Sequence, residues 1–268
     1  MSDTHPTFGT FNQGEVPTIA CFNQASTPLG VDLDALIAAM QTFVDHYVAP
    51  VWATPAKLVK SKGFLKGAWA MVFLDDADTA GALAYHDLTP DGLPESKVFV
   101  KTTLDNHDLV SVSASHELVE MLVDPAINLM TTGPDPKIIY AYESADPVEA
   151  LSFPVNGIPM TDFVFPAYFE AFHKAGSAQF DQMKKVKKPF QILAGGYQII
   201  FKNGKVERSH RIDQEEFWGR QRFPDFEAAA AALRGWETRY NYERFSLALQ
   251  GRTPAEKLAA LQPPRRAA

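Results

Sequence analysis

A histidine and three acidic residues interrupt the apolar segment SHELVEMLVDP, which spans residues 115–125. If this segment is a helix, each residue turns by about 100° from the last. Measured from His116, Glu120 then lies at about 40°, Asp124 at about 80° and Glu117 at about 100°. Apolar residues fill the rest of the circumference, which is typical of a buried helix. We therefore expect the polar stripe to face a cavity or a binding partner.

The charges of this stripe favour a metal site. Glu120 and Asp124 form a like-charge pair one turn apart, which is unfavourable on an isolated helix, and Glu117 adds a third carboxylate. A bound cation relieves this repulsion. His116 and Glu120 also have the one-turn spacing that two metal ligands on one helix require. The alternative without a metal is a solvated surface stripe, which is what most runs of charge are.

A second acidic cluster follows in the segment IIYAYESADPVEA, residues 138–150, which contains Glu143, Asp146 and Glu149. Between Asp105 and Glu149 the chain has nine acidic residues and one lysine. The two clusters are thus candidates for one site, with Glu149 and Asp124 as the weaker candidates. Asp124 and Asp146 each precede a proline, so a role in a turn is the alternative for both.

The residues His116-Glu117-Leu118-Val119-Glu120 resemble the active-site helix of zincin metallopeptidases, H-E-x-x-H, with Glu in place of the second histidine. The segment Tyr142-Glu143-Ser144-Ala145-Asp146 is similar to the N-E-x-x-S-D segment that supplies a glutamate ligand in thermolysin-like gluzincins. The run GALAYHDLTPDGLPESKVFV, residues 81–100, looks like the zincin edge strand and its loop, where His86 could line the cleft. The pattern HELxExLVDP also resembles one in uncharacterised bacterial and phage proteins.

This resemblance implies a set of roles for the acidic residues. The metal ligands would be His116, Glu120 and Glu143, with Asp146 as a further ligand or as a partner of His116. Glu117 would be the general base that accepts a proton from metal-bound water. Tyr197 would stabilise the oxyanion, although the preceding Gly195-Gly196 is also consistent with plain backbone geometry. Two carboxylates and one histidine make a harder site than two histidines, so we expect Zn²⁺ with Mn²⁺, Fe²⁺ or Ca²⁺ as alternatives.

The function that the resemblance implies is metal-assisted hydrolysis of peptide or amide bonds, with a peptide or protein as the substrate. One alternative is a catalytically silent zincin-like fold whose metal or acidic pocket serves structure or binding. The replaced histidine favours that alternative, and the retained Glu117 opposes it. A calcium-stabilised interaction module is disfavoured because His116 is a poor ligand for a hard ion.

Composition and charge exclude several other classes. The 268 residues include 46% hydrophobic and 21% charged residues, which is typical of a globular protein. The net charge of −7 and the pI near 5.5 argue against a nucleic-acid partner, and no apolar run is long enough to span a membrane. The single cysteine, Cys21, excludes a disulfide framework and is expected in the core. The polar start of the chain lacks a secretory signal, which predicts a cytoplasmic location.

The order of elements predicts an α+β fold: a small mixed sheet with an active-site helix, followed by a mainly helical C-terminal half. We expect a zincin-like catalytic core over residues 1–205, a helical extension over 206–250, and a short helix with a disordered tail over 251–268. The short helix TPAEKLAALQ has a capping box from Thr253 to Glu256 and an apolar face that could dock on a partner. The basic run KKVKK, residues 184–188, is expected to be a solvated loop.

Overall fold

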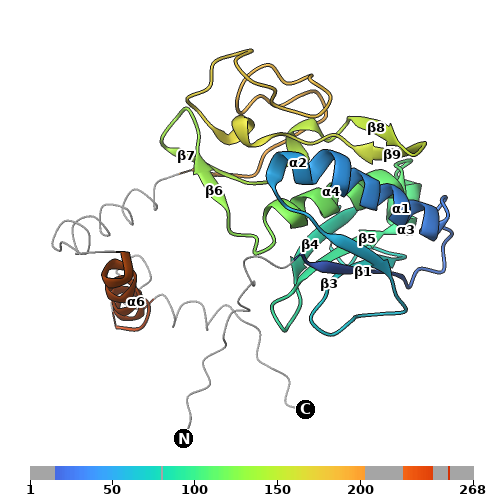
Figure 1. The fold of residues 1–268 in the computed structure, drawn as a ribbon, viewed down its shortest axis with the longest axis horizontal. Helices are drawn as coiled ribbons and strands as arrows, with labels where there is room; N and C mark the ends of the chain where they lie inside the picture. Colours follow the sequence, from blue (N-terminus) through green and yellow to red (C-terminus); the bar gives the residue numbers. More distant parts are fainter. Residues whose placement is uncertain (1–15, 80, 203–225, 244–252, 254–268) are drawn as a thin grey trace, which may run out of the picture. The chain divides into compact units, whose positions relative to one another are not determined.

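The structure is a computed structural model that describes residues 16–79, 81–202, 226–243 and 253 (Figure 1). The chain divides into two units, residues 1–202 and residues 203–268. The first unit contains the acidic clusters and is described first. Within the described residues, no helix is long and apolar enough to cross a membrane.

Five strands of the first unit form one mixed sheet in the order β2-β1-β3-β5-β4. Their bounds are β1 Thr18–Asn23, β2 Lys57–Lys60, β3 Trp69–Leu74, β4 Ala84–Leu88 and β5 Pro94–Phe99. β1, β2, β3 and β5 run parallel, and β4 pairs with β5 in the antiparallel direction. β4 is therefore the reversed edge strand of the sheet.

Side chains alternate between the two faces of the sheet, as strand geometry requires. Ile19 and Cys21 of β1 belong to the main hydrophobic core, whereas Phe22 packs in a small cluster on the other face. Burial raises the pKa of the Cys21 thiol to about 12, so this cysteine is a buried, unreactive core residue as expected.

Helices cover the face of the sheet that carries the main core. They are α1 Leu33–Phe43, a π-helical turn Val44–Val48, α2 Ala49–Trp52, α3 Val100–Asp105 and α4 Val110–Val123. The side chain of Asp32 accepts a hydrogen bond from the backbone N–H of Ala35 and caps α1. α1 packs on β2, and α4 packs on β4 and β5 (Figure 1). α4 is the buried acidic helix of the sequence prediction, and it ends at Asp124-Pro125 as expected.

A third layer lies on the opposite side of α4 from the sheet. The hairpin of β8 Ser152–Val155 and β9 Ile158–Thr161 packs against α4. A separate three-stranded sheet contains β6 Met130–Thr132, β7 Ile138–Ala141 and β10 Ile200–Lys202. With packing on both sides, α4 buries nearly its whole circumference, including Glu117 and Glu120.

A fold of helices and a small mixed sheet is confirmed, but a mainly helical C-terminal half is not. Between residues 126 and 202 the helical structure consists of two 3₁₀ turns, Asp146–Val148 and Pro166–Phe169. One physical reason is that buried aspartates compete for the backbone in this region. Asp181 accepts hydrogen bonds from the N–H groups of Lys185 and Val186, so the basic run forms a loop around this carboxylate.

The second unit contains helix α6, Phe226–Tyr242, which lies within the helical extension expected over residues 206–250. Trp236 and Tyr240 lie one turn apart on α6, with their rings tilted by 32° and their ring centroids 5.1 Å apart. Several predictions lie outside the described residues: the polar N-terminus, the short helix after Thr253 and the C-terminal tail.

Candidate metal centre and adjoining pocket

The edge strand β4 directs one histidine onto the acidic helix. His86 pairs with Ser96 in the register of β4 and β5, and Ser96 lies against α4 with its hydroxyl 3.5 Å from the carbonyl of Glu117. The preceding residue, Tyr85, faces away from the helix and donates its hydroxyl to Asp78. The alternation of the strand therefore places His86 over the acidic stripe of α4.

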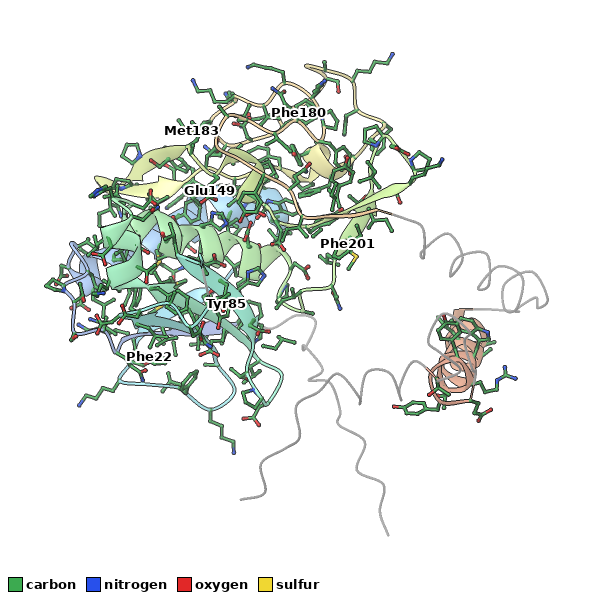
Figure 2. The ribbon with its side chains drawn as sticks, turned by 180° about the vertical axis from the view of Figure 1, so that it is seen from behind. Phe22, Tyr85, Glu149, Phe180, Met183 and Phe201 are labelled. Carbon is green, nitrogen blue, oxygen red and sulfur yellow. The ribbon has the colours of Figure 1, made fainter. Side chains whose placement is uncertain are left out.

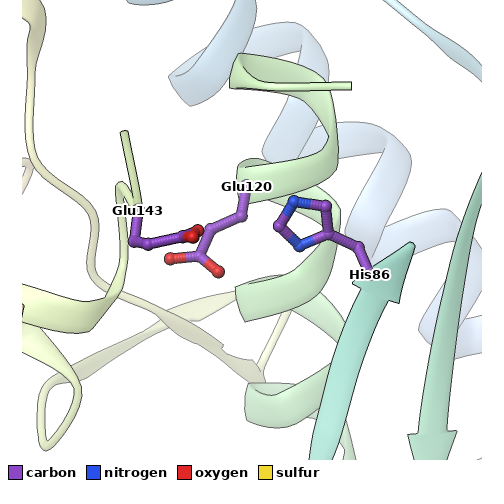
Figure 3. Close-up of side chains that lie close together, drawn as sticks. All are labelled: His86, Glu120 and Glu143. Atoms are coloured by element: carbon purple, nitrogen blue, oxygen red, sulfur yellow. The ribbon is translucent and has the colours of Figure 1, made fainter. Parts of the chain in front are cut away.

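The two nitrogens of His86 have different surroundings. Nδ1 lies 3.2 Å from Oε2 of Glu117. Nε2 is buried and has no hydrogen-bond partner, and the whole side chain is only 7% exposed. One ligand atom each of Glu120 and Glu143 lies within 4.8 Å of a nitrogen of His86 and of the other, and Figure 3 shows these two carboxylates beside the ring. The imidazole of His86 thus lies next to an acidic pair.

His116 is enclosed by three carboxylates. Its Nε2 lies 3.3 Å from Oε2 of Glu120 and 3.3 Å from Oδ1 of Asp146, and its Nδ1 lies 3.0 Å from Oε2 of Glu149. Burial alone would lower the pKa of His116, but these three carboxylates outweigh burial and raise the pKa well above its usual value. Figure 2 shows Glu149 between Tyr85 of the edge strand and Phe180, and the side chain of Glu149 is 37% exposed.

Backbone contacts attach the second acidic cluster to α4. Oε1 of Glu120 accepts hydrogen bonds from the N–H groups of Ala145, at 3.0 Å, and Asp146, at 3.4 Å. Asp146 begins the 3₁₀ turn, and its carbonyl accepts a 3.0 Å hydrogen bond from the N–H of Tyr197. Gly196 permits this approach, because a Cβ at that position would lie 2.4 Å from the carbonyl oxygen of Pro147. The Gly-Gly pair therefore brings Tyr197 to the cluster.

Burial and neighbouring charges shift the pKa values of the cluster. Burial and the charge of Glu120 raise the pKa of Glu143 to about 8 and that of Asp146 to about 6. Burial would lower the pKa of His86, but the hydrogen bond with Glu117 and the charge of Glu120 raise it to about 9. Burial also raises the pKa of Glu117. The cluster has a high density of carboxylates for a buried site. Such a site favours the binding of cations, which are either protons or metal ions.

The donor set fits a divalent metal ion. Within the described part of the chain, no Lys or Arg forms an ion pair with these carboxylates; their ion pairs are with His86 and His116. Three groups of potential ligands cluster closely: His86-Glu120-Glu143, His116-Glu117-Glu120 and His116-Asp146-Glu149. His116 and Glu143 do not share a group, so Glu143 lies on the His86 side of Glu120.

A pocket of about 750 Å³ opens beside the cluster. Its lining includes four site residues, His116, Glu117, Glu149 and Tyr197, and also the start of β4 and the loop between α3 and α4. His86, Glu120 and Glu143 do not line the pocket. The side of His116 and Glu117 is therefore the side that a substrate in the pocket would meet.

Asp124, the weakest ligand candidate, has a structural role. Its carboxylate accepts hydrogen bonds from the N–H groups of Asn128 and Leu129 and so turns the chain after α4. The contact of Glu149 with His116 and a ligand role for His86 were not predicted from the sequence. The alternation of side chains along β4 indicates that His86 and Tyr85 point to opposite faces of the sheet. The sequence does not show that α4 lies on the face of His86, because this depends on the strand order of the sheet.

Comparison with known proteins finds one similarity. Residues 201–254 match a family model described as an integrase core domain. The match covers about a fifth of the chain, nearly all of it in the second unit, and includes none of the residues around the pocket. No curated protein and no solved structure matches the chain.

This finding corrects two expectations. The family model that matches is an integrase core domain, so the assignment to zincin metallopeptidases is wrong. The expectation of a peptide or protein substrate without nucleic acid is also wrong, because the matched family points to nucleic acid. The physical reason is that H-E-x-x-E and E-x-x-D are short motifs, and the ligand trio they implied, His116, Glu120 and Glu143, does not form one close group.

Proposed function

We propose that the protein is a divalent-metal-dependent hydrolase whose reaction takes place in the pocket beside His116 and Glu117. The observation that carries the proposal is the arrangement around His116, where one imidazole nitrogen faces two buried carboxylates and the other is held by a third. Buried carboxylates without Lys or Arg partners are costly unless a cation joins them. A metal ion at this position satisfies that requirement.

The ligands that we assign to this ion are Nε2 of His116 and the carboxylates of Glu120 and Asp146. Each of these carboxylates lies 3.3 Å from Nε2 of His116, which fits because two ligand atoms about 2.1 Å from one ion at a tetrahedral angle are roughly 3.4 Å apart. Glu120 and Asp146 do not share one close group with His116, so binding of the ion would draw the two carboxylates together. Glu149 fixes the orientation of His116 through Nδ1, as carboxylates commonly do for metal-ligating histidines. One imidazole with two carboxylates suits Mn²⁺, Fe²⁺ or Zn²⁺ better than Ca²⁺.

The chain supplies the groups that hydrolysis needs around this position. A divalent ion would contribute Lewis acidity and lower the pKa of a water molecule. Glu117 lines the pocket and accepts the proton of the attacking water; its raised pKa makes it a stronger base than an exposed glutamate. Tyr197 also lines the pocket and donates its hydroxyl to the oxygen that becomes negative.

We infer a nucleic-acid phosphodiester as the substrate, and this inference rests on the integrase core similarity of residues 201–254. The carboxylates that line the pocket would repel a phosphate. Bound cations remove that repulsion, which makes metal a requirement for substrate binding as well as for chemistry.

The test is hydrolysis of labelled single- and double-stranded DNA and RNA by the full chain with Mn²⁺, Mg²⁺ or Zn²⁺. Glu117→Gln keeps the shape of the side chain but cannot accept the proton, so we expect a loss of about 10²–10⁴-fold in rate. Glu170→Gln, which changes a glutamate outside the cluster, is the matched control and should be fully active.

Metal-dependent cleavage that Glu117→Gln abolishes supports the proposal. If nucleic acids stay intact but a panel of simple phosphate and carboxylate esters is hydrolysed with the same dependence on Glu117, the hydrolase assignment stands and the nucleic-acid substrate is wrong. If the chain binds metal and hydrolyses nothing, it is a metal-binding protein without catalysis and the proposed function is wrong.

A further inference from the structure

The unpaired nitrogen of His86 has no role in the metal position described above. Nε2 is buried without a hydrogen-bond partner in a side chain that is 93% buried, because its exposed fraction is 7%. An unpaired buried polar atom costs free energy, so such atoms normally have a partner. The carboxylates of Glu120 and Glu143, which are acceptors when ionised, lie beside the ring, each with an oxygen within 4.8 Å of one of its nitrogens (Figure 3).

The other nitrogen determines what Nε2 can bind. Nδ1 lies 3.2 Å from the carboxylate of Glu117, which favours the tautomer with the proton on Nδ1. In that tautomer Nε2 carries a lone pair and can bind a metal ion directly. The arrangement carboxylate–histidine–metal is the one in which a histidine ligand is held in place by an acidic partner.

We propose that His86, Glu120 and Glu143 hold a second divalent cation, which shares Glu120 with the ion at His116 and Asp146. This inference rests on the proposed function for the first position. One candidate ligand atom from each of the three residues lies within 4.8 Å of the other two. Small movements of the side chains would bring all three atoms to bonding distance from one ion. Oε1 of Glu120 accepts hydrogen bonds from the N–H groups of Ala145 and Asp146, so Oε2, which lies 3.3 Å from His116, is the oxygen that would bridge the two ions.

The charges of the cluster support two ions rather than one. Five carboxylates surround the two histidines: Glu117, Glu120, Glu143, Asp146 and Glu149. One divalent ion balances two of these negative charges, and a second ion balances two more. Within the described residues, no Lys or Arg pairs with Glu143, so the second cation has no competitor there.

The two positions have different access. His116 lines the pocket, whereas His86, Glu120 and Glu143 do not. The second ion therefore does not meet the substrate. It would bind Glu120 on the side away from the pocket. It would also fix the position of His86, whose Nδ1 contacts the carboxylate of Glu117 at the pocket wall.

The experiment measures bound Mn²⁺ by elemental analysis of the full chain after metal loading and desalting, together with the electron paramagnetic resonance spectrum. Wild type should hold two Mn²⁺ per chain and show a spin-coupled spectrum. Glu143→Gln and His86→Gln should each hold one Mn²⁺ and show an uncoupled spectrum. Glu170→Gln and His173→Gln change an ion pair outside the cluster and should keep two. Circular dichroism checks that every variant is folded.

The outcomes separate this proposal from the first one. A single Mn²⁺ in wild type that persists in Glu143→Gln and His86→Gln keeps the proposed function and overturns the second position. A single Mn²⁺ that is lost in Glu143→Gln but kept in Asp146→Asn overturns both the two-ion proposal and the first position. No bound metal in folded wild type removes both proposals.

Discussion

Oε2 of Glu117 lies 3.2 Å from Nδ1 of His86, although the two residues are 31 positions apart and come from helix α4 and edge strand β4. This contact joins the sheet to the acidic helix at the wall of the pocket. It connects the residue that we assign as the base to the residue that we assign to the second ion.

Removal of metal should destabilise the protein. A ligand that binds only the folded state adds stability by mass action, about 2.7 kcal/mol when its free concentration is 100 times its Kd. Chelation should therefore lower the melting temperature, and addition of Mn²⁺ should restore it. An unchanged melting temperature, with metal removal confirmed by elemental analysis, would argue against a site that contributes to the fold.

Tyr197→Phe should slow hydrolysis without loss of metal. Loss of one donor to a developing negative oxygen typically costs about 10²–10³-fold in kcat. Tyr47→Phe, which changes a tyrosine that packs on Phe43 and Phe153, is the matched control. Steady-state kinetics measure both variants. An unchanged kcat for Tyr197→Phe would remove this residue from the mechanism.

Gly196→Ala should weaken the site through the backbone. The added Cβ would lie 2.4 Å from the carbonyl oxygen of Pro147, so the segment that contains Asp146 must move. We expect a lower melting temperature and weaker Mn²⁺ binding by isothermal titration calorimetry. Gly63→Ala is the control, because a Cβ there meets no atom within 4 Å. Equal behaviour of the two variants would show that the contact does not position Asp146.

Part of this arrangement could be predicted from the sequence. The 3.6-residue periodicity of residues 110–123 identified α4, because the apolar residues of a buried helix leave a recognisable acidic stripe. The sequence of the hairpin of β8 and β9 indicates only a turn at Asn156-Gly157, since Pro154 and Pro159 obscure the two short strands.

The pairing of site residues depends on tertiary structure that the sequence does not encode locally. His86 reaches α4 because β4 is the reversed edge strand, a matter of sheet order rather than of local pattern. The separate positions of Glu143 and Asp146 depend on the 3₁₀ turn that begins at Asp146. Three residues apart in sequence, these two carboxylates approach different histidines.

The buried pair Asp162 and Asp181 should make stability depend on pH. Burial and the neighbouring Asp181 raise the pKa of Asp162 from 3.8 to about 8. Because the folded-state pKa is above the unfolded value, this contribution is fully present below about pH 4 and is lost as the pH rises to about 8.

Asp162→Asn tests this dependence, because Oδ1 of the amide can still accept hydrogen bonds from the N–H groups of Phe163 and Met183. The free energy of unfolding from urea titrations at pH 5 and pH 8 is the measurement. Relative to wild type, Asp162→Asn should gain stability between pH 5 and pH 8. A constant difference between the two proteins would show that Asp162 does not titrate in this range.

Glu120 is the ligand that the two proposed metal ions share. Oε2 of Glu120 faces His116, and its carboxylate also lies within 4.8 Å of His86 and Glu143. The direct test is the Mn²⁺ content of folded Glu120→Gln, whose amide oxygen preserves the acceptor for the N–H of Ala145. Wild type should retain two Mn²⁺ per chain after desalting, and Glu120→Gln should retain none. Two Mn²⁺ per chain in folded Glu120→Gln would contradict this shared role.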